Sequence, residues 1–139
     1  MVFEKILVLV DGSKPSEKAL EYAGEIGKLA GSKVFILRVI ERIAPVEQEV
    51  SEVHLQGIVN EIKGYLSDEK GKLESMGVDV ETMYDLGDIE SKLEEYCEKL
   101  KPNLIVTGHI KRSKMMEYLQ ESVAYIALSD SPCPVMVVK

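Results

Sequence analysis

Five short apolar runs alternate with longer amphipathic segments, and this alternation limits the possible folds more than any other feature. The runs cover residues 6–10, 34–40, 78–84, 104–107 and 135–138. The first is apolar throughout and rich in β-branched residues, as is typical of a central parallel strand covered on both faces. Residues 78–84 instead alternate apolar and polar side chains, which indicates a half-exposed edge strand.

The segments between these runs carry helix signals. Ser13 stands where an N-cap is expected, Pro15 follows in the first turn, and Gly31 offers a C-terminal stop. A second, polar helix is expected over about residues 51–76, with a bend or a frayed start because three glycines lower its helix propensity. A third helix follows Gly87 and ends before Pro102, and a fourth covers roughly residues 122–128.

The element order is therefore β-α-β-α-β-α-β-α-β, in which each helix connects two strands. Right-handed crossovers between such strands give an α/β fold with a doubly wound, five-stranded parallel sheet, most simply in the strand order 3-2-1-4-5. The chain contains neither a linker nor an internal repeat, so residues 1–139 are predicted to form a single domain.

Composition excludes several classes of function. The formal net charge is −7, and no basic stripe offsets it, so we expect no binding to nucleic acid. No apolar run approaches the roughly 18–20 residues that a membrane span needs, and the first residues lead directly into a strand pattern. We therefore expect a cytoplasmic protein. Cys97 and Cys133 lack metal-ligand spacing and are predicted to be small buried residues in a reducing compartment.

Several motifs together resemble the universal stress protein family over essentially the whole chain. They are VLVDGSKPS at residues 8–16, LRVI at 37–40, the pair Gly87-Asp88, LIVTG at 104–108, Ser122-Val123 and SPCPVMVV at 131–138. The resemblance implies a Rossmann-like fold of the adenine nucleotide α-hydrolase type. It also implies a stress-associated protein, usually a homodimer, in which the last strands of two subunits pair across the symmetry axis.

Some members of this family bind ATP and others do not. The ATP-binding members carry Gly-x2-Gly-x9-Gly-Ser/Thr after the fourth strand. Gly108 and Ser122 match the two ends of this motif, but Lys111 and Glu121 replace the two inner glycines. A phosphate loop needs glycine where the backbone approaches the anion closely. Glu121 would stabilise the start of a helix by about 0.3–1 kcal/mol, but it puts negative charge where a triphosphate would lie.

The resemblance also suggests a site for the base and the ribose. Asp11 corresponds to the family's acid near the ribose or adenine, and Val39 to the strand residue whose backbone faces adenine. Ligands of open α/β sheets bind beyond the carboxyl ends of the strands, where both residues are expected. Asp11 also has the simpler interpretation of a turn residue that caps its own loop.

The candidate nucleotide-binding residues are therefore six: Asp11, Val39, Gly108, Lys111, Ser122 and Val123. Lys111 could pair with Glu121, reach a phosphate with the help of Arg112, or lie in solvent. We expect weak or absent ATP binding and, as the main interpretation, no cofactor. A nucleoside, AMP or ADP, with Mg²⁺, is the alternative, in which the protein acts as a nucleotide-dependent switch.

An enzyme and a receiver domain are less consistent with the sequence. His54 and His109 belong to no Ser-His-Asp arrangement and have no metal-ligand spacing, so the chain is predicted to be non-catalytic. A receiver domain needs an acidic pair after the first strand and a phosphoacceptor after the third. Asp11 stands alone and Asp85 is only loosely placed for that role.

A protein-interaction module is the remaining class. Four residues after the fourth strand form an adaptable apolar group that suits core or dimer packing or a patch for a protein partner: Met115, Met116, Tyr118 and Leu119. The apolar last strand would be an unpaired edge in a monomer. We therefore expect a homodimer that pairs through this strand.

Overall fold

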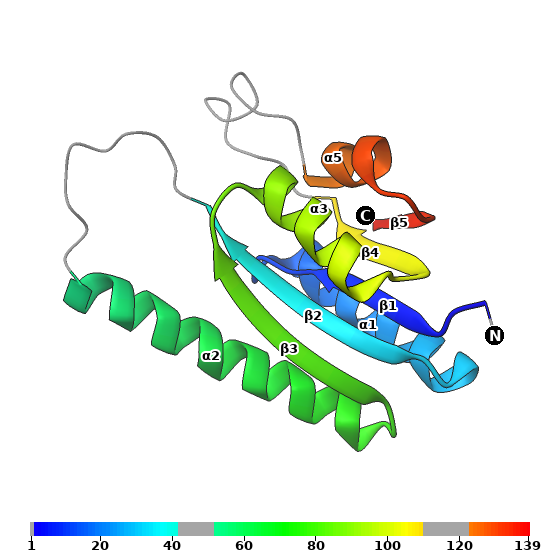
Figure 1. Ribbon diagram of the computed structural model, residues 1–139. Helices are drawn as coiled ribbons and strands as arrows, with labels where there is room; N and C mark the ends of the chain where they lie inside the picture. Colours follow the sequence, from blue (N-terminus) through cyan, green and yellow to red (C-terminus); the bar gives the residue numbers. More distant parts are fainter. Residues whose placement is uncertain (1, 42–51, 110–122) are drawn as a thin grey trace.

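The computed structural model describes residues 2–41, 52–109 and 123–139. It shows a five-stranded parallel sheet with helices on both faces (Figure 1). The strands are β1 (Lys5–Leu9), β2 (Lys33–Ile40), β3 (Asp79–Leu86), β4 (Leu104–Gly108) and β5 (Val135–Val138). They are arranged as β3-β2-β1-β4-β5, and all neighbouring pairs are parallel. This order confirms the predicted fold class.

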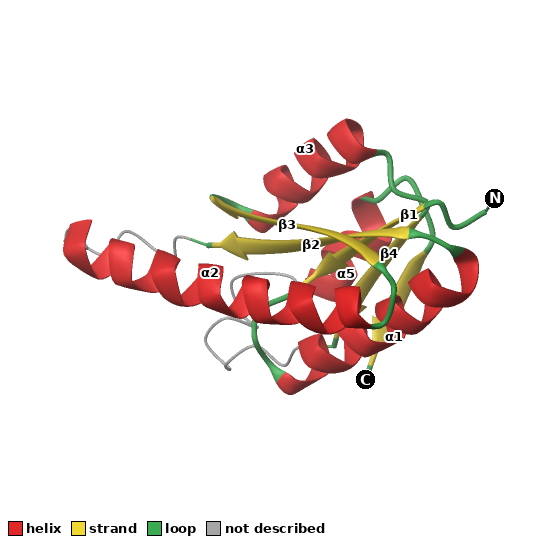
Figure 2. Ribbon diagram, turned by 90° about the horizontal axis from the view of Figure 1, so that it is seen from below, coloured by secondary structure: helices red, strands yellow, loops and turns green. Residues whose placement is uncertain are grey.

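The helices form two layers, one on each face of the sheet (Figure 2). One layer holds α1 (Lys14–Ala30) and α2 (Glu52–Ser75), whose apolar side chains pack in one hydrophobic cluster. The other holds α3 (Ile89–Leu100) and α5 (Val123–Asp130), which contribute to a second cluster. Because side chains alternate along a strand, Ile6 and Val8 of β1 face the first cluster while Leu7 and Leu9 face the second.

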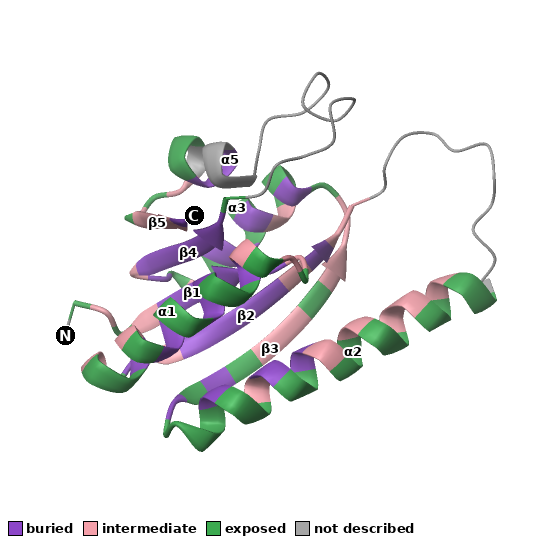
Figure 3. Ribbon diagram, turned by 180° about the vertical axis from the view of Figure 1, so that it is seen from behind, coloured by how far each residue is buried: buried purple, intermediate pink, exposed green. Residues whose placement is uncertain are grey.

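Burial follows the pattern expected of a central and an edge strand (Figure 3). Apart from its first residue, β1 is buried throughout, whereas β3 contains only one buried residue. Full burial of an aliphatic side chain contributes about 1.5–3 kcal/mol, so the central strands supply much of the core. The predicted central and edge positions are confirmed.

Local signals place the helix ends as predicted. The Ser13 side chain accepts a hydrogen bond from the Ser16 N–H at the start of α1, and Gly31 ends this helix in the left-handed conformation at φ 70°. Asp88 caps α3 in the same way, by accepting from the N–H of Ser91. Each N-cap of this kind contributes typically about 1 kcal/mol to stability.

Some predicted boundaries and environments differ from the structure. β3 extends to Leu86, two residues beyond the predicted end, and α2 is one helix of 24 residues without a break at its glycines.

The two cysteines differ in their burial. Cys97 is buried, but Cys133 is only half-buried. These cysteines are free thiols in the same hydrophobic cluster, and burial, followed by the neighbouring Cys133, raises the pKa of Cys97 to about 11.

The glycines of α2 generate a stability prediction. Gly57, Gly64 and Gly71 face open space, where an added Cβ meets nothing within 4 Å. Replacing each by alanine should stabilise the protein by about 0.5–1 kcal/mol, because alanine restricts the unfolded chain and favours the helix. Urea unfolding of the single variants measures this, and a lower midpoint for all three would contradict the prediction.

Candidate functional site

The carboxyl ends of β1, β2 and β4 meet at one edge of the sheet, where the strand order reverses between β1 and β4. Ligands of open α/β sheets bind at such a switch point, because the loops after the two strands leave toward opposite faces. Here α1 follows β1 on one face, and α5 lies on the other (Figure 1). The sequence-predicted residues Asp11, Val39 and Gly108 all lie along this edge.

Asp11 organises the loop between β1 and α1. Its Oδ1 accepts the N–H of Ser13 at 2.9 Å, and its own N–H donates to Oγ of Ser16 at 3.0 Å. Gly12, between these residues, has φ 83°, which favours glycine. The interpretation of Asp11 as a residue that caps its own loop is therefore correct. Its second carboxylate oxygen, Oδ2, accepts no hydrogen bond from another described residue.

Gly108 ends β4 against the first turn of α1. A Cβ on Gly108 would lie 2.5 Å from the carbonyl carbon of Pro15, 2.6 Å from its oxygen and 2.7 Å from the amide nitrogen of Ser16. Backbone atoms cannot yield as the end of a flexible side chain can, so no larger residue fits without moving β4 or α1. This packing explains the glycine without reference to a phosphate.

Val39 presents backbone groups past the end of β1. The pairing of β1 with β2 ends at Leu9 and Leu37, and the C=O of Leu37 accepts the N–H of Val10 at 3.0 Å. Peptide groups alternate sides along a strand, so the N–H and C=O of Val39 point the same way as those of Leu37. The C=O of Ile40 points oppositely and accepts the N–H of Gly87. Val39 therefore offers one donor and one acceptor toward the space that β1 has left.

Tyr65 lies near this edge of the sheet, and the sequence did not predict that position. It projects from α2, and its buried hydroxyl oxygen lies near Ser16 and Asp11 but forms no hydrogen bond with any described residue. Burial, followed by the negative charge of Glu69, raises the pKa of Tyr65, so the phenol keeps its proton. In the sequence, Tyr65 is one of several apolar positions of the expected helix. That pattern does not indicate where its hydroxyl group lies.

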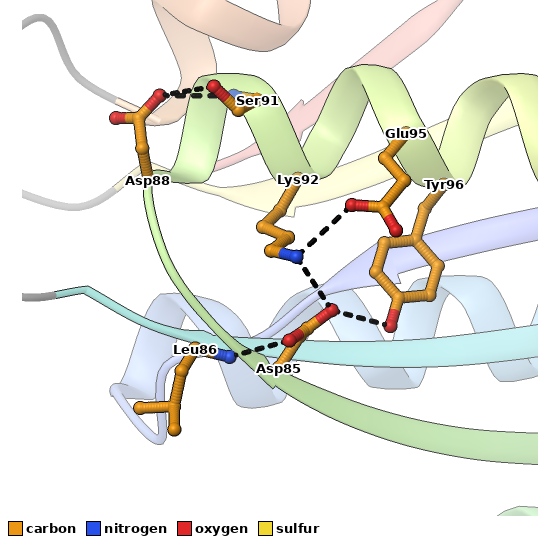
Figure 4. A network of polar contacts seen from close by, with 7 residues as sticks. All are labelled: Asp85, Leu86, Asp88, Ser91, Lys92, Glu95 and Tyr96. Carbon is orange, nitrogen blue, oxygen red and sulfur yellow. Dashed lines mark hydrogen bonds and ion pairs between the residues drawn. The ribbon is translucent and has the colours of Figure 1, made fainter.

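A polar network fixes the adjacent end of β3 (Figure 4). Oδ2 of Asp85 accepts from the Tyr96 hydroxyl and pairs with Nζ of Lys92, both at 3.1 Å, while Oδ1 accepts the N–H of Leu86 at 2.8 Å. Although burial opposes it, hydrogen bonding from Lys92, from the Leu86 N–H and from Tyr96 lowers the pKa of Asp85. Each of the two carboxylate oxygens has a partner, which makes Asp85 a structural residue.

The strand order also separates this protein from receiver domains. Receiver domains use the order 2-1-3-4-5, in which the third strand lies beside the first. Here β3 is an edge strand with β2 between it and β1. Asp85 and Asp11 are therefore two strands apart, and the chain does not have the receiver arrangement.

The phosphate half of the predicted site lies mostly outside the described residues. Lys111 and Ser122 belong to that part, as do Glu121, Arg112 and the apolar group at residues 115–119. Val123 is the first residue of α5. The assignments of Lys111, Ser122 and Val123 to a ligand site stay predictions.

Other chemistry receives little support from the described residues. His109 is exposed, and its backbone N–H donates to the C=O of Val138 at 2.7 Å. Within residues 2–41, 52–109 and 123–139, no three His, Cys, Asp or Glu side chains form a group that could hold a metal ion. In the same ranges no helix has the length and hydropathy to cross a membrane.

Comparisons with known proteins agree with this fold. A family model described as the universal stress protein family matches residues 3–139. The chain is 30% identical to universal stress protein YxiE of Bacillus subtilis, over 99% of this chain and 100% of that protein. It is also 30% identical to universal stress protein MJ0531 of Methanocaldococcus jannaschii, over 99% of this chain and 83% of the relative.

Solved structures of lower sequence identity have the same fold. UspA from Lactobacillus plantarum superimposes with a TM-score of 0.83 at 20% identity, over 99% of this chain and 98% of that one. Three further neighbours are described as universal stress proteins with cAMP, with dAMP (from Archaeoglobus fulgidus) and with AMP (from Arabidopsis thaliana). Their TM-scores are 0.76, 0.69 and 0.67, their identities 22%, 20% and 18%, and each comparison covers at least 90% of both chains.

The tight contact at Gly108 generates a second prediction. Gly108→Ala should destabilise the protein by about 1–3 kcal/mol, because the new methyl group must displace backbone at the start of α1. Urea unfolding measures the loss, and Gly57→Ala is the matched control in open space. Unchanged stability of Gly108→Ala would show that the end of β4 does not depend on this contact.

Proposed function

Because the chain belongs to the universal stress protein family, we propose that it is a non-catalytic, cytoplasmic stress-response domain that binds a small adenine nucleotide, with weak or no affinity for ATP. The site is the edge formed by Asp11 and Val39 beside the end of β1. A protein of this kind reports the concentration of its ligand by binding it and does not transform it.

The observation that carries this proposal is the pair of backbone groups of Val39 past the end of β1. One N–H donor and one C=O acceptor side by side match the edge of adenine, which offers a ring nitrogen acceptor beside its amino donor. Oδ2 of Asp11, on the neighbouring strand end, suits a ribose hydroxyl. Three structural neighbours described with cAMP, dAMP and AMP support an adenine monophosphate as the class of ligand.

The preference against ATP rests on the residues that replace the inner glycines of the family's phosphate motif. Lys111 adds bulk to that loop, and Glu121 adds a negative charge near the start of the last helix. A single phosphate needs fewer of the loop's backbone donors than a triphosphate does, and it meets less repulsion from Glu121. AMP is therefore tolerated better than ATP.

The absence of catalysis is proposed from the way the nearby carboxylates are used. Oδ1 of Asp11 accepts a hydrogen bond from its own loop, and Asp85 is held by Lys92 and Tyr96. Both carboxylates are engaged in contacts that position the strand ends, and both oxygens of Asp85 already have partners within the protein. Incubation with ATP or AMP should therefore yield no product above the uncatalysed rate.

Binding measurements test the site. Calorimetry should show AMP binding, and ATP binding about tenfold weaker or undetectable. Asp11→Asn should weaken the binding of AMP by about 1.5 kcal/mol or more. The amide oxygen still accepts the N–H of Ser13, but the amide NH₂ group, which is a donor, replaces the second carboxylate oxygen.

Asp88→Asn is the matched control, since it removes the same charge at a helix cap where asparagine serves equally well. Equal effects of the two substitutions, equal affinity for AMP and ATP, or a failure of AMP to bind at all would each overturn the proposal.

We also propose a homodimer that pairs through β5. This strand ends the sheet, and its residues Val135, Met136 and Val137 are only half-buried. The C=O groups of Pro134 and Val138 face β4, where they accept the N–H groups of Ile105 and His109. By alternation, Val135 and Val137 direct their N–H and C=O outward, ready to pair with a second copy.

Proline substitutions test this pairing. Val137→Pro should yield a folded monomer by light scattering, because it removes an outward N–H and leaves the bonds to β4 intact. Met136→Pro is the contrast, since the N–H of Met136 faces β4 and its loss should destabilise the fold. A wild-type monomer, or a Val137→Pro variant that stays dimeric, would refute pairing through β5.

A further inference from the structure

A groove opens between α2 and β3, away from the candidate nucleotide site. The helix and strand lie closest where α2 ends, and they separate toward the start of the helix (Figures 1 and 3). The apolar contact at the closed end joins Leu66 and Leu73 to Val78 and Val80. Where the two elements part, they enclose a groove of about 590 Å³. Its lining consists of four α2 residues and three β3 residues: Lys63, Leu66, Ser67 and Lys70, and Thr82, Met83 and Tyr84.

The charge of this groove is opposite to that of the protein. Its lining holds two lysines and no carboxylate, in a chain with a net charge of −7. Neither Lys63 nor Lys70 forms an ion pair with any of the described residues. Two of the nearby acids are engaged elsewhere, because Glu69 pairs with Lys72 and Glu81 pairs with Lys33. The two ammonium groups are therefore available to an anion.

The polar groups of α2 lie along the same side of the groove. Lys63, Ser67 and Lys70 follow the i, i+4, i+7 pattern, so they lie along one side of α2, with the lysines about 10 Å apart along its axis. Thr82 faces α2 from the strand, because it alternates with Val80, which packs against this helix.

Tyr84 completes the groove at its open end. It follows Thr82 on the same face of β3, and Nζ of Lys63 lies 5.8 Å from the centre of its ring. This cation–π contact holds the ammonium group over the opening. The ring of Tyr84 supplies apolar surface beside the donors, and the buried Leu66 lies beneath it.

We propose that this groove is a second ligand site, which binds a small organic molecule through a phosphate group. Two ammonium groups and the hydroxyls of Ser67 and Thr82 offer several donors to one tetrahedral anion, and lysine binds phosphate well as a point charge. The carbon part of the molecule packs on the ring of Tyr84. A groove of this volume is within the range of small-molecule sites, roughly 300–1,000 Å³.

Amide NMR of the full chain tests this site with phenyl phosphate as the probe. Saturable shifts should appear at residues 63–70 and 82–84. Inorganic phosphate should bind the same amides more weakly, because it lacks the apolar part that packs on Tyr84. The double variant Lys63→Gln/Lys70→Gln should raise the Kd by about tenfold or more.

The charge-matched control is Lys28→Gln/Lys99→Gln, which removes two exposed lysines from α1 and α3 and should leave the Kd within about twofold. Circular dichroism verifies that both variants are folded. Shifts that fail to saturate, or an equal loss of affinity in both double variants, would overturn the proposal. Either result would attribute the effect to the net charge of the protein.

The same spectra separate this site from the nucleotide site. Shifts confined to residues 11–16, 39 and 108 would assign the phosphate to the strand edge and also overturn the groove proposal. Conversely, saturable shifts in the groove that persist in Asp11→Asn would support the groove even if AMP failed to bind at the edge.

Discussion

The end of β4 rests on the first turn of α1 with no side chain between them. Gly108 lies so close to Pro15 and Ser16 that a single added carbon would overlap with backbone. This contact joins the two halves of the sheet where the strand order reverses, and so fixes the loop after β1 relative to the end of β4. Asp11 hydrogen-bonds within the same loop, and its second carboxylate oxygen is positioned by that geometry.

The same contact changes what the glycine signifies. From the sequence, Gly108 resembles the first position of a phosphate motif, whereas in the structure the packing of α1 already requires it. Its presence is therefore compatible with a member of the family that binds no triphosphate. The backbone groups of Val39 instead suit an adenine ligand, and no substitution at that position except proline removes them.

The elements, their order and the caps could be predicted because they depend on local patterns. The β-branched runs, Ser13 and Gly31 each act through neighbours in the sequence. The right-handed crossover rule then determines the strand order. The position of Tyr65 and the occupied carboxylate of Asp85 could not be predicted. The surroundings of both side chains come from elements that meet only after folding. The same holds for the groove, whose lysines belong to α2 and whose opposite wall is β3.

Two separate ligand sites on one small acidic protein would give it two inputs. The strand edge between β1 and β2 suits an adenine monophosphate, and the groove between α2 and β3 suits another phosphate-bearing molecule. The elements that bound the two sites are contiguous, since β2 and β3 pair along their whole length and Gly87 donates to the C=O of Ile40 at the shared end. Occupation of the groove could therefore be sensed at the strand edge through small shifts of β3.

Native mass spectrometry of freshly purified protein tests the central claim most directly, because it reports subunit number and bound ligand together. The account predicts a dimer that carries AMP or another adenine monophosphate and releases it on mild activation. A monomer without ligand that stays unliganded after addition of AMP would contradict it, as would a dimer that retains ATP in preference to AMP.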